Sequence, residues 1–187
     1  MLSLSEADQK AILELARQAV VEAVCHNRRL GQIPTEGVFA TKRGVFVTLH
    51  VQKRLHGCIG MIDAKEPLGE NIVHCGLSAA LEDPRFARMK PADLATLEIE
   101  VSLLSSLEPI RPEEVEIGKH GLLIEHRFHR GLLLPQVAVE HHLDRERFLR
   151  ETCHKAGLPG EAWKAPETRL YGFTCEIIAD PEFRDRK

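Results

Sequence analysis

The segment Leu55-His56-Gly57-Cys58-Ile59-Gly60 combines a thiol, an imidazole and two glycines. If the segment is an extended strand, His56 and Cys58 lie on the same face, because strand side chains alternate with period two. An imidazole beside a thiol can accept its proton and produce the nucleophilic thiolate. Gly57 and Gly60 leave the backbone around Cys58 open to close approach. The pattern predicts a reactive cysteine, and a buried cysteine in a tightly packed strand is the alternative.

Two further segments carry charged groups that could bind a substrate. The Gly118-Lys119-His120-Gly121 segment combines a cation and an imidazole with flexible backbone, and could orient an anionic group; a tight turn between strands is the alternative. The Asp83-Pro84-Arg85-Phe86 segment could place Asp83 and Arg85 near the Cys58 strand. A helix-ending turn held by an Asp–Arg pair is the competing interpretation.

Paired carboxylates and metal ligands are weaker candidates. Glu98 and Glu100 share one face of a predicted strand, which is more often the solvated face of a half-buried strand than an acid–base pair. His50, His56 and Cys58 could share a metal only if separate strands bring them together. No recognised ligand spacing, phosphate loop or dinucleotide fingerprint occurs, so we expect no metal and no cofactor.

Composition limits the class of protein. The chain has 187 residues, 43% hydrophobic and 28% charged, which is typical of a globular protein and fits one domain over residues 1–187, with a small subdomain lobe as a variant. A net charge of −3, one Trp and one Tyr argue against nucleic-acid binding. The sequence shows no membrane span and no signal peptide. Five scattered cysteines indicate reduced thiols, and hence a cytoplasmic protein.

Hydrophobic periodicity predicts the elements that position these groups. Three amphipathic helices are expected, at 6–30, 68–82 and 144–156. Two hairpins are expected, 38–41 with 45–49 and 121–124 with 131–134. Single strands are expected at 55–62, 97–103 and 169–178. The two hairpins resemble each other around a basic dipeptide and a glycine, which suggests a duplicated strand and helix unit or a chance similarity.

Several segments together resemble one known family. The Cys58 segment is similar to the L-R-G-C-I-G motif of the AMMECR domain. Further segments fit that family's pattern in the same order: Asp83–Phe86, Leu97–Ser102, Ile117–Leu122, Gly131–Ala138 and Lys155–Leu158. The resemblance covers roughly residues 10 to 178. It differs at His56, where the family usually has Arg; unlike arginine, histidine can lose its charge near neutral pH.

The resemblance implies a compact α+β fold with a curved, mostly antiparallel sheet, built from two related strand and helix repeats and flanked by helices. Relatives are often grouped with a Memo-like protein and a radical S-adenosylmethionine (SAM) protein, which are therefore the expected partners. No three-cysteine cluster motif occurs here, so the chain would not itself be the radical enzyme. The family has no securely established activity.

The leading hypothesis is a cysteine-dependent enzyme or modification factor that acts on a small molecule or peptide. In it, Cys58 is the nucleophile or covalent carrier, and His56 or His120 is the base. Arg85 and Lys119 bind an anionic group, in a cleft that Gly57 and Gly60 help to shape. The rival hypothesis is a non-catalytic adaptor for a partner protein, in which Gly57, Cys58 and Gly60 shape a groove.

Overall fold

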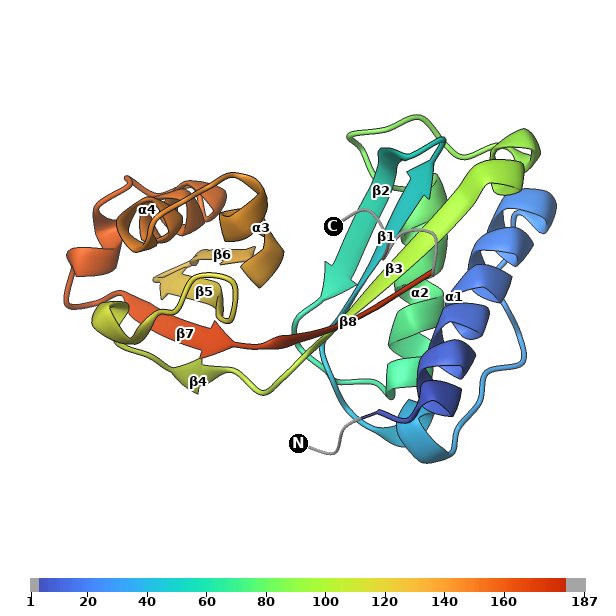
Figure 1. Ribbon diagram of the computed structural model, residues 1–187, viewed down its shortest axis with the longest axis horizontal. Coiled ribbons are helices and arrows are strands. Elements are labelled where there is room, and N and C mark those ends of the chain that lie inside the picture. Colours follow the sequence, from blue (N-terminus) through green and yellow to red (C-terminus); the bar gives the residue numbers. More distant parts are fainter. Residues whose placement is uncertain (1–3, 181–187) are drawn as a thin grey trace. The chain divides into compact units, whose positions relative to one another are not determined.

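The computed structural model describes residues 4–180, which divide into two compact units (Figure 1). The first unit contains residues 4–103 and 176–180, and the second contains residues 104–175. Each unit has a four-stranded sheet with helices packed on it. The predicted α+β class with antiparallel strands is confirmed. The strands form two separate sheets.

The first unit begins with helix α1 (Glu6–His26). Its N-terminus has a capping box, in which Ser5 and Asp8 satisfy each other's backbone N–H groups. The predicted end near residue 30 is wrong. Asn27 takes the left-handed conformation, with φ of 50°, and its N–H donates to the Ala23 carbonyl. Asparagine tolerates this conformation better than most residues, so it ends the helix before Gly31.

The sheet of the first unit packs one face on α1 and on α2 (Leu68–Leu81). Its strands are β1 (Val45–Val51), β2 (Arg54–Met61), β3 (Leu97–Leu104) and β8 (Cys175–Ala179), in the order β2-β1-β3-β8. Val47 and Ile99 from the sheet join Ile12 and Ile72 from the helices in one buried core. Alternation then turns Thr48, the cross-strand partner of Cys58, to the opposite face.

The predicted hairpin of 38–41 with 45–49 is wrong. Residues Gly37–Ala40 form a 3₁₀ helix, η1, with Phe39 buried in the core. The strand β1 pairs instead with β2, through a turn at Gln52 and Lys53, which have φ of 50° and 66°. Because glycine and asparagine are the usual residues at such positions, Gln-Lys gave no visible turn signal in the sequence.

The expected solvated face of β3 is also wrong. All eight residues of the strand are buried, and Glu98 and Glu100 are only 8% and 6% exposed. The strand order contributes, since β3 lies between β1 and β8 and side chains of both neighbours flank its own. Both carboxylates lie on the Cys58 face, because Glu100 is opposite Thr48 and Glu98 is opposite His50.

The second unit follows a similar plan. Its strands are β4 (Glu108–Pro109), β5 (Gly121–His126), β6 (His129–Leu133) and β7 (Arg169–Phe173), in the order β4-β7-β5-β6. The predicted β5–β6 hairpin is confirmed. The predicted helix after Asp144 is α4 (Arg145–Lys155), and α3 (Pro135–Glu140) was not predicted. The expected closing strand divides at Thr174 into β7 and β8.

Three further 3₁₀ helices connect these elements: η2 (Pro91–Thr96), η3 (Pro112–Glu114) and η4 (Ala162–Lys164). The core of the second unit contains Leu122 from β5, Ala138 from α3, and Phe148 and Leu149 from α4. Each unit therefore has its own buried apolar cluster.

Candidate functional site

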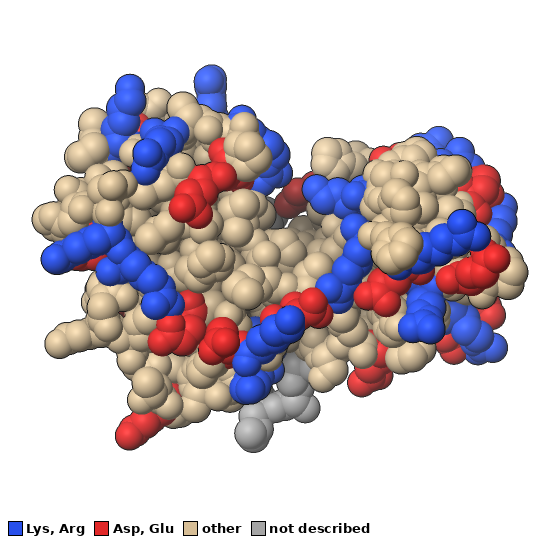
Figure 2. All heavy atoms as spheres, turned by 180° about the vertical axis from the view of Figure 1, so that it is seen from behind, with Lys and Arg blue, Asp and Glu red and all other residues tan. Residues whose placement is uncertain are grey.

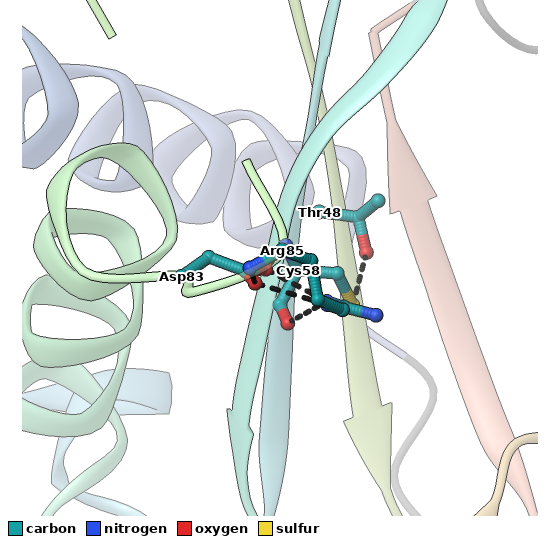
Figure 3. Close-up of polar contacts among 4 residues, drawn as sticks. All are labelled: Thr48, Cys58, Asp83 and Arg85. Atoms are coloured by element: carbon teal, nitrogen blue, oxygen red, sulfur yellow. Dashed lines mark hydrogen bonds and ion pairs between the residues drawn. The ribbon is translucent and has the colours of Figure 1, made fainter. Parts of the chain in front are cut away.

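Cys58 lies in the middle of β2, directly opposite Thr48 of β1. The Thr48 Oγ1 hydroxyl donates a hydrogen bond to the Cys58 sulfur, with a distance of 3.3 Å (Figure 3). Thr48 is 9% exposed, whereas Cys58 is half-buried. The sulfur is therefore oriented by a fixed neighbour and remains partly accessible.

The Cys58 backbone is held by the turn that follows α2. Its N–H donates to Asp83 Oδ2 at 2.9 Å, and its carbonyl accepts from an Arg85 guanidinium nitrogen at 2.8 Å. Arg85 also donates through Nε to Asp83 Oδ1 at 2.9 Å and through a terminal nitrogen to Asp83 Oδ2 at 2.7 Å (Figure 3). Both sequence interpretations of this turn are thus realised together, because the Asp–Arg pair is also the contact with the Cys58 strand.

The charges of this turn stabilise each other. The pKa of the Asp83 carboxyl is lowered to about 2. The main cause is the hydrogen bond from the Arg85 side chain, and the backbone N–H groups of Cys58 and Arg85 also contribute. In return, Asp83 raises the pKa of the Arg85 guanidinium. The Asp83 side chain is 2% exposed and that of Arg85 is 51% exposed. Asp83 is thus a buried anchor, while Arg85 presents a permanent cation at the surface beside Cys58.

His56 lies at an irregularity of β2 that the sequence did not predict. The β1–β2 register pairs Leu49 with Gly57 and His50 with Leu55, so His56 is an extra residue in a β-bulge. A bulge interrupts the alternation on which the same-face prediction relied. The His56 ring stacks on Phe86, with centroids 6.3 Å apart. The hydrogen-bond donor to the Cys58 sulfur is Thr48 rather than His56.

The two glycines that flank Cys58 are explained by packing inside the unit. A Cβ atom at Gly57 would lie 2.0 Å from the backbone oxygen of Ala79, so the missing side chain lets β2 approach α2. A Cβ atom at Gly60 would lie 2.2 Å from the Phe46 ring, which covers this glycine from the neighbouring strand. Protein atoms therefore fill the space beside each glycine, and the substrate-binding roles of Gly57 and Gly60 stay predictions.

The remaining predicted site residues, His120 and Lys119, belong to the second unit. The Lys119 ammonium forms an ion pair with Glu116 at 2.7 Å. His120 Nδ1 accepts a hydrogen bond from the Glu116 N–H at 3.1 Å. These contacts form a local turn around Glu116, and the roles proposed for both residues stay predictions.

The other cysteines differ from Cys58 in their surroundings. Burial raises the pKa of the Cys75 thiol to about 12, with a smaller contribution from Cys58. Burial also raises the pKa of Cys153. Cys25 is exposed, near the end of α1, and Cys175 is half-buried. Of the two thiols in the motif strand and its facing helix, Cys58 is the accessible one.

Thr48 is the site residue that sequence reasoning missed. The alternation of β1 could have indicated it, because Thr48 lies on the other face of the strand from Val47 and Leu49. The incorrect pairing of β1 with residues 38–41 concealed its position beside Cys58. A hairpin with residues 52 and 53 as its turn would have identified it.

The structure describes no metal site and no membrane-spanning helix within residues 4–180. No group of three or more His, Cys, Asp or Glu side chains there is arranged to hold a metal ion. None of the helices there is both long and apolar enough to cross a bilayer. On the face shown in Figure 2, Lys and Arg side chains are interspersed with Asp and Glu side chains.

Comparison with known proteins identifies the family. The AMMECR1 family profile matches residues 13–178, which span both units. The chain belongs to the AMMECR1 family. The predicted resemblance is thereby confirmed, with the Cys58 motif strand inside the matched region.

Relatives in archaea cover nearly the whole chain. A protein of Methanothermobacter thermautotrophicus is 40% identical over 184 residues, covering 94% of this chain and 95% of its own. A protein of Thermococcus gammatolerans is 43% identical, covering 90% and 88%. The crystal structure of the uncharacterized protein PH0010 from Pyrococcus horikoshii has a TM-score of 0.87 and 37% identity, covering 92% of this chain and 91% of that one. These matches establish the family and the fold of the chain, and the names of the matched proteins state no activity.

Proposed function

We propose that this AMMECR1-family protein is a cysteine-dependent enzyme or modification factor, with Cys58 as its nucleophile and covalent carrier. Its substrate is a small molecule or a peptide that supplies an electrophilic carbonyl carbon. The expected setting is the cytoplasm, in a pathway with Memo-like and radical SAM proteins. The roles of His56, His120 and Lys119 as base and anion-binding groups remain predictions.

The observation that carries this proposal is the fixed geometry of a partly exposed thiol. The peptide units on both sides of Cys58 are held by the pair of buried Asp83 and exposed Arg85, and the sulfur has its own hydrogen-bond donor in Thr48. A packing cysteine needs none of these contacts, since burial alone would stabilise it. Preorganised supporting contacts of this kind are typical of reactive groups.

The chemical step follows from the atoms present. The Cys58 thiol loses its proton to water, and the sulfur adds to the carbonyl carbon of the substrate. The S–C bond forms as the bond from that carbon to the leaving group breaks; the leaving group departs with the electron pair and takes a proton from water. The Thr48 hydroxyl donates to the sulfur while it is negatively charged, and Arg85 offers a cation to an anionic part of the substrate.

The adaptor hypothesis loses one of its supports. It treated Gly57, Cys58 and Gly60 as shape requirements of a groove, but a Cβ atom at either glycine would meet Ala79 or Phe46 of the same unit. Internal packing is a sufficient reason for these glycines. Cys58 then has no explanation in a groove, whereas a covalent role accounts for its partial exposure and its supporting contacts.

The proposal is tested by isolating the protein from its native host and mapping adducts on its cysteines by mass spectrometry. We expect a mass increase on Cys58 that hydroxylamine removes, as it removes a thioester, and no such adduct on Cys25, the exposed control. Cys58→Ser should abolish the adduct and the cellular function. An unmodified Cys58 together with full function of Cys58→Ser would contradict the proposal.

A further inference from the structure

The second unit has a hollow of about 470 Å³ that is separate from the Cys58 strand. It opens where the end of β6, helix α3 and helix α4 meet. Small-molecule sites in proteins usually have volumes of roughly 300–1,000 Å³. The hollow is therefore large enough for a compact ligand.

The floor of the hollow is apolar. It is formed by Leu133 at the end of β6, Val137 of α3 and Leu143 of the connection between α3 and α4. Leu133 and Leu143 pack against the buried core that contains Phe148. All three floor side chains are half-buried, so a ligand would cover apolar surface that the fold itself leaves partly exposed.

The rim carries groups that donate hydrogen bonds. Glu151, His154 and Lys155 lie on one face of α4, because residues three and four apart are neighbours on a helix, and His141 follows α3. The Glu151 carboxylate lies 3.3 Å from His154 Nδ1 and is therefore in contact with that imidazole. Because the Glu151 carboxylate faces His154, the Lys155 ammonium and the His141 imidazole are the rim groups that can donate to an anionic ligand.

The connection between α3 and α4 carries two of the lining residues, His141 and Leu143. His142 has φ of 51°, a left-handed conformation that costs energy for a residue with a side chain. The His141 and Leu143 N–H groups donate to the Val137 and Ala138 carbonyls at 3.1 Å and 2.8 Å. This combination of a left-handed residue and a hydrogen bond from Leu143 to Ala138 is a common way for a helix to end. It places His141 and Leu143 directly after α3, where both line the hollow.

We propose that this hollow binds a carboxylate carried on a short aliphatic chain, either as a free acid or as the C-terminus of a peptide. The aliphatic part lies on Leu133, Val137 and Leu143, and the carboxylate accepts hydrogen bonds from His141 and Lys155. The site is independent of Cys58, so it would stand even if the covalent role failed.

The experiment is an NMR titration of the ¹⁵N-labelled full chain with sodium hexanoate, hexanol and hexylamine. We expect saturable shifts confined to residues 133–155, with a hexanoate Kd on the order of 1 mM, as for the few non-hydrogen atoms of this probe. Hexanol and hexylamine should bind at least about fivefold more weakly, because neither supplies an anion to the rim. N-acetyl-leucine binding more tightly than hexanoate would assign the site to a peptide C-terminus, and the reverse to a free acid.

Two variants and a matched control separate the parts of the site. Lys155→Met should weaken hexanoate binding about fivefold and leave hexanol binding unchanged. Lys65→Met, a change of an exposed lysine in the first unit, should alter neither. Val137→Phe should fill the floor and weaken both probes. Equal affinities of hexanoate and hexanol, or no saturable shifts in the wild-type chain, would overturn the proposal.

Discussion

Asp83 is the residue whose removal should most clearly disturb the support of Cys58. Its side chain is 2% exposed and accepts hydrogen bonds from the Cys58 N–H, from the Arg85 N–H and from the Arg85 guanidinium. Asp83→Asn keeps the shape of the side chain and removes its charge. The amide cannot accept from all these donors at both of its ends, because its nitrogen is itself a donor.

The magnitude follows from the pKa of Asp83. A fall from 3.8 to about 2 on folding corresponds to about 2 kcal/mol of stabilisation at neutral pH. A carboxyl with a lowered pKa in the folded state contributes fully above its unfolded pKa, and the contribution is lost as the pH falls toward the folded value. Asp83 therefore contributes fully above about pH 5 and should lose about 1 kcal/mol by pH 3.

The assay is urea unfolding of the wild type and of Asp83→Asn between pH 7 and pH 3. We expect a difference in unfolding free energy of about 2 kcal/mol at pH 7 that falls by about half at pH 3. Asp144→Asn is the control, because Asp144 is an exposed N-cap and asparagine caps helices equally well. A difference below about 0.5 kcal/mol for Asp83→Asn at pH 7, or one that does not change with pH, would refute the reasoning.

Three further predictions concern packing, accessibility and helix ending. Gly57→Ala should destabilise the protein by about 3 kcal/mol or more in urea unfolding, since its Cβ would lie 2.0 Å from the Ala79 oxygen. Gly31→Ala, with open space around it, should be nearly neutral, and an equal effect of the two would count against the packing explanation. Cys75 is buried and has a pKa of about 12, so it should resist iodoacetamide at pH 8 in the folded protein while the exposed Cys25 reacts. Peptide mass spectrometry would measure both, and comparable labelling of the two cysteines would contradict the burial of Cys75. Asn27→Ala should lower the free energy of unfolding by about 1 kcal/mol and Asn27→Gly should not, because only alanine is strained at φ of 50°. A larger loss of stability for Asn27→Gly than for Asn27→Ala would contradict the assigned end of α1.

Local signals in the sequence predicted much of the fold. The helices that begin near residues 6 and 144 and the strand at 97–103 were predicted from neighbouring residues, and α1, α4 and β3 lie at these positions. What could not be predicted depends on contacts between distant segments. The burial of Glu98 and Glu100 follows from the place of β3 inside a sheet, and that place is not encoded in the alternation of the strand itself.

The candidate site shows the same division. Cys58 and Arg85 were identified from motifs, and the structure places them in contact. The same-face prediction for His56 depended on an uninterrupted strand, and the strand has a bulge at His56. Thr48 was missed because the turn at Gln52 and Lys53 uses residues that seldom adopt positive φ. Register errors therefore had a larger effect on the site than on the fold class.

The central claim, that Cys58 is an accessible and functional thiol, is tested most directly by its alkylation in the folded protein as a function of pH. We would measure the labelling rate of each cysteine by peptide mass spectrometry between pH 5 and pH 9, in the wild type and in Thr48→Val. The account predicts that Cys58 labels without unfolding, and that its rate and pH profile change in Thr48→Val while those of Cys25 do not. If Cys58 resists labelling until the protein unfolds, it is a packing residue and the claim is contradicted.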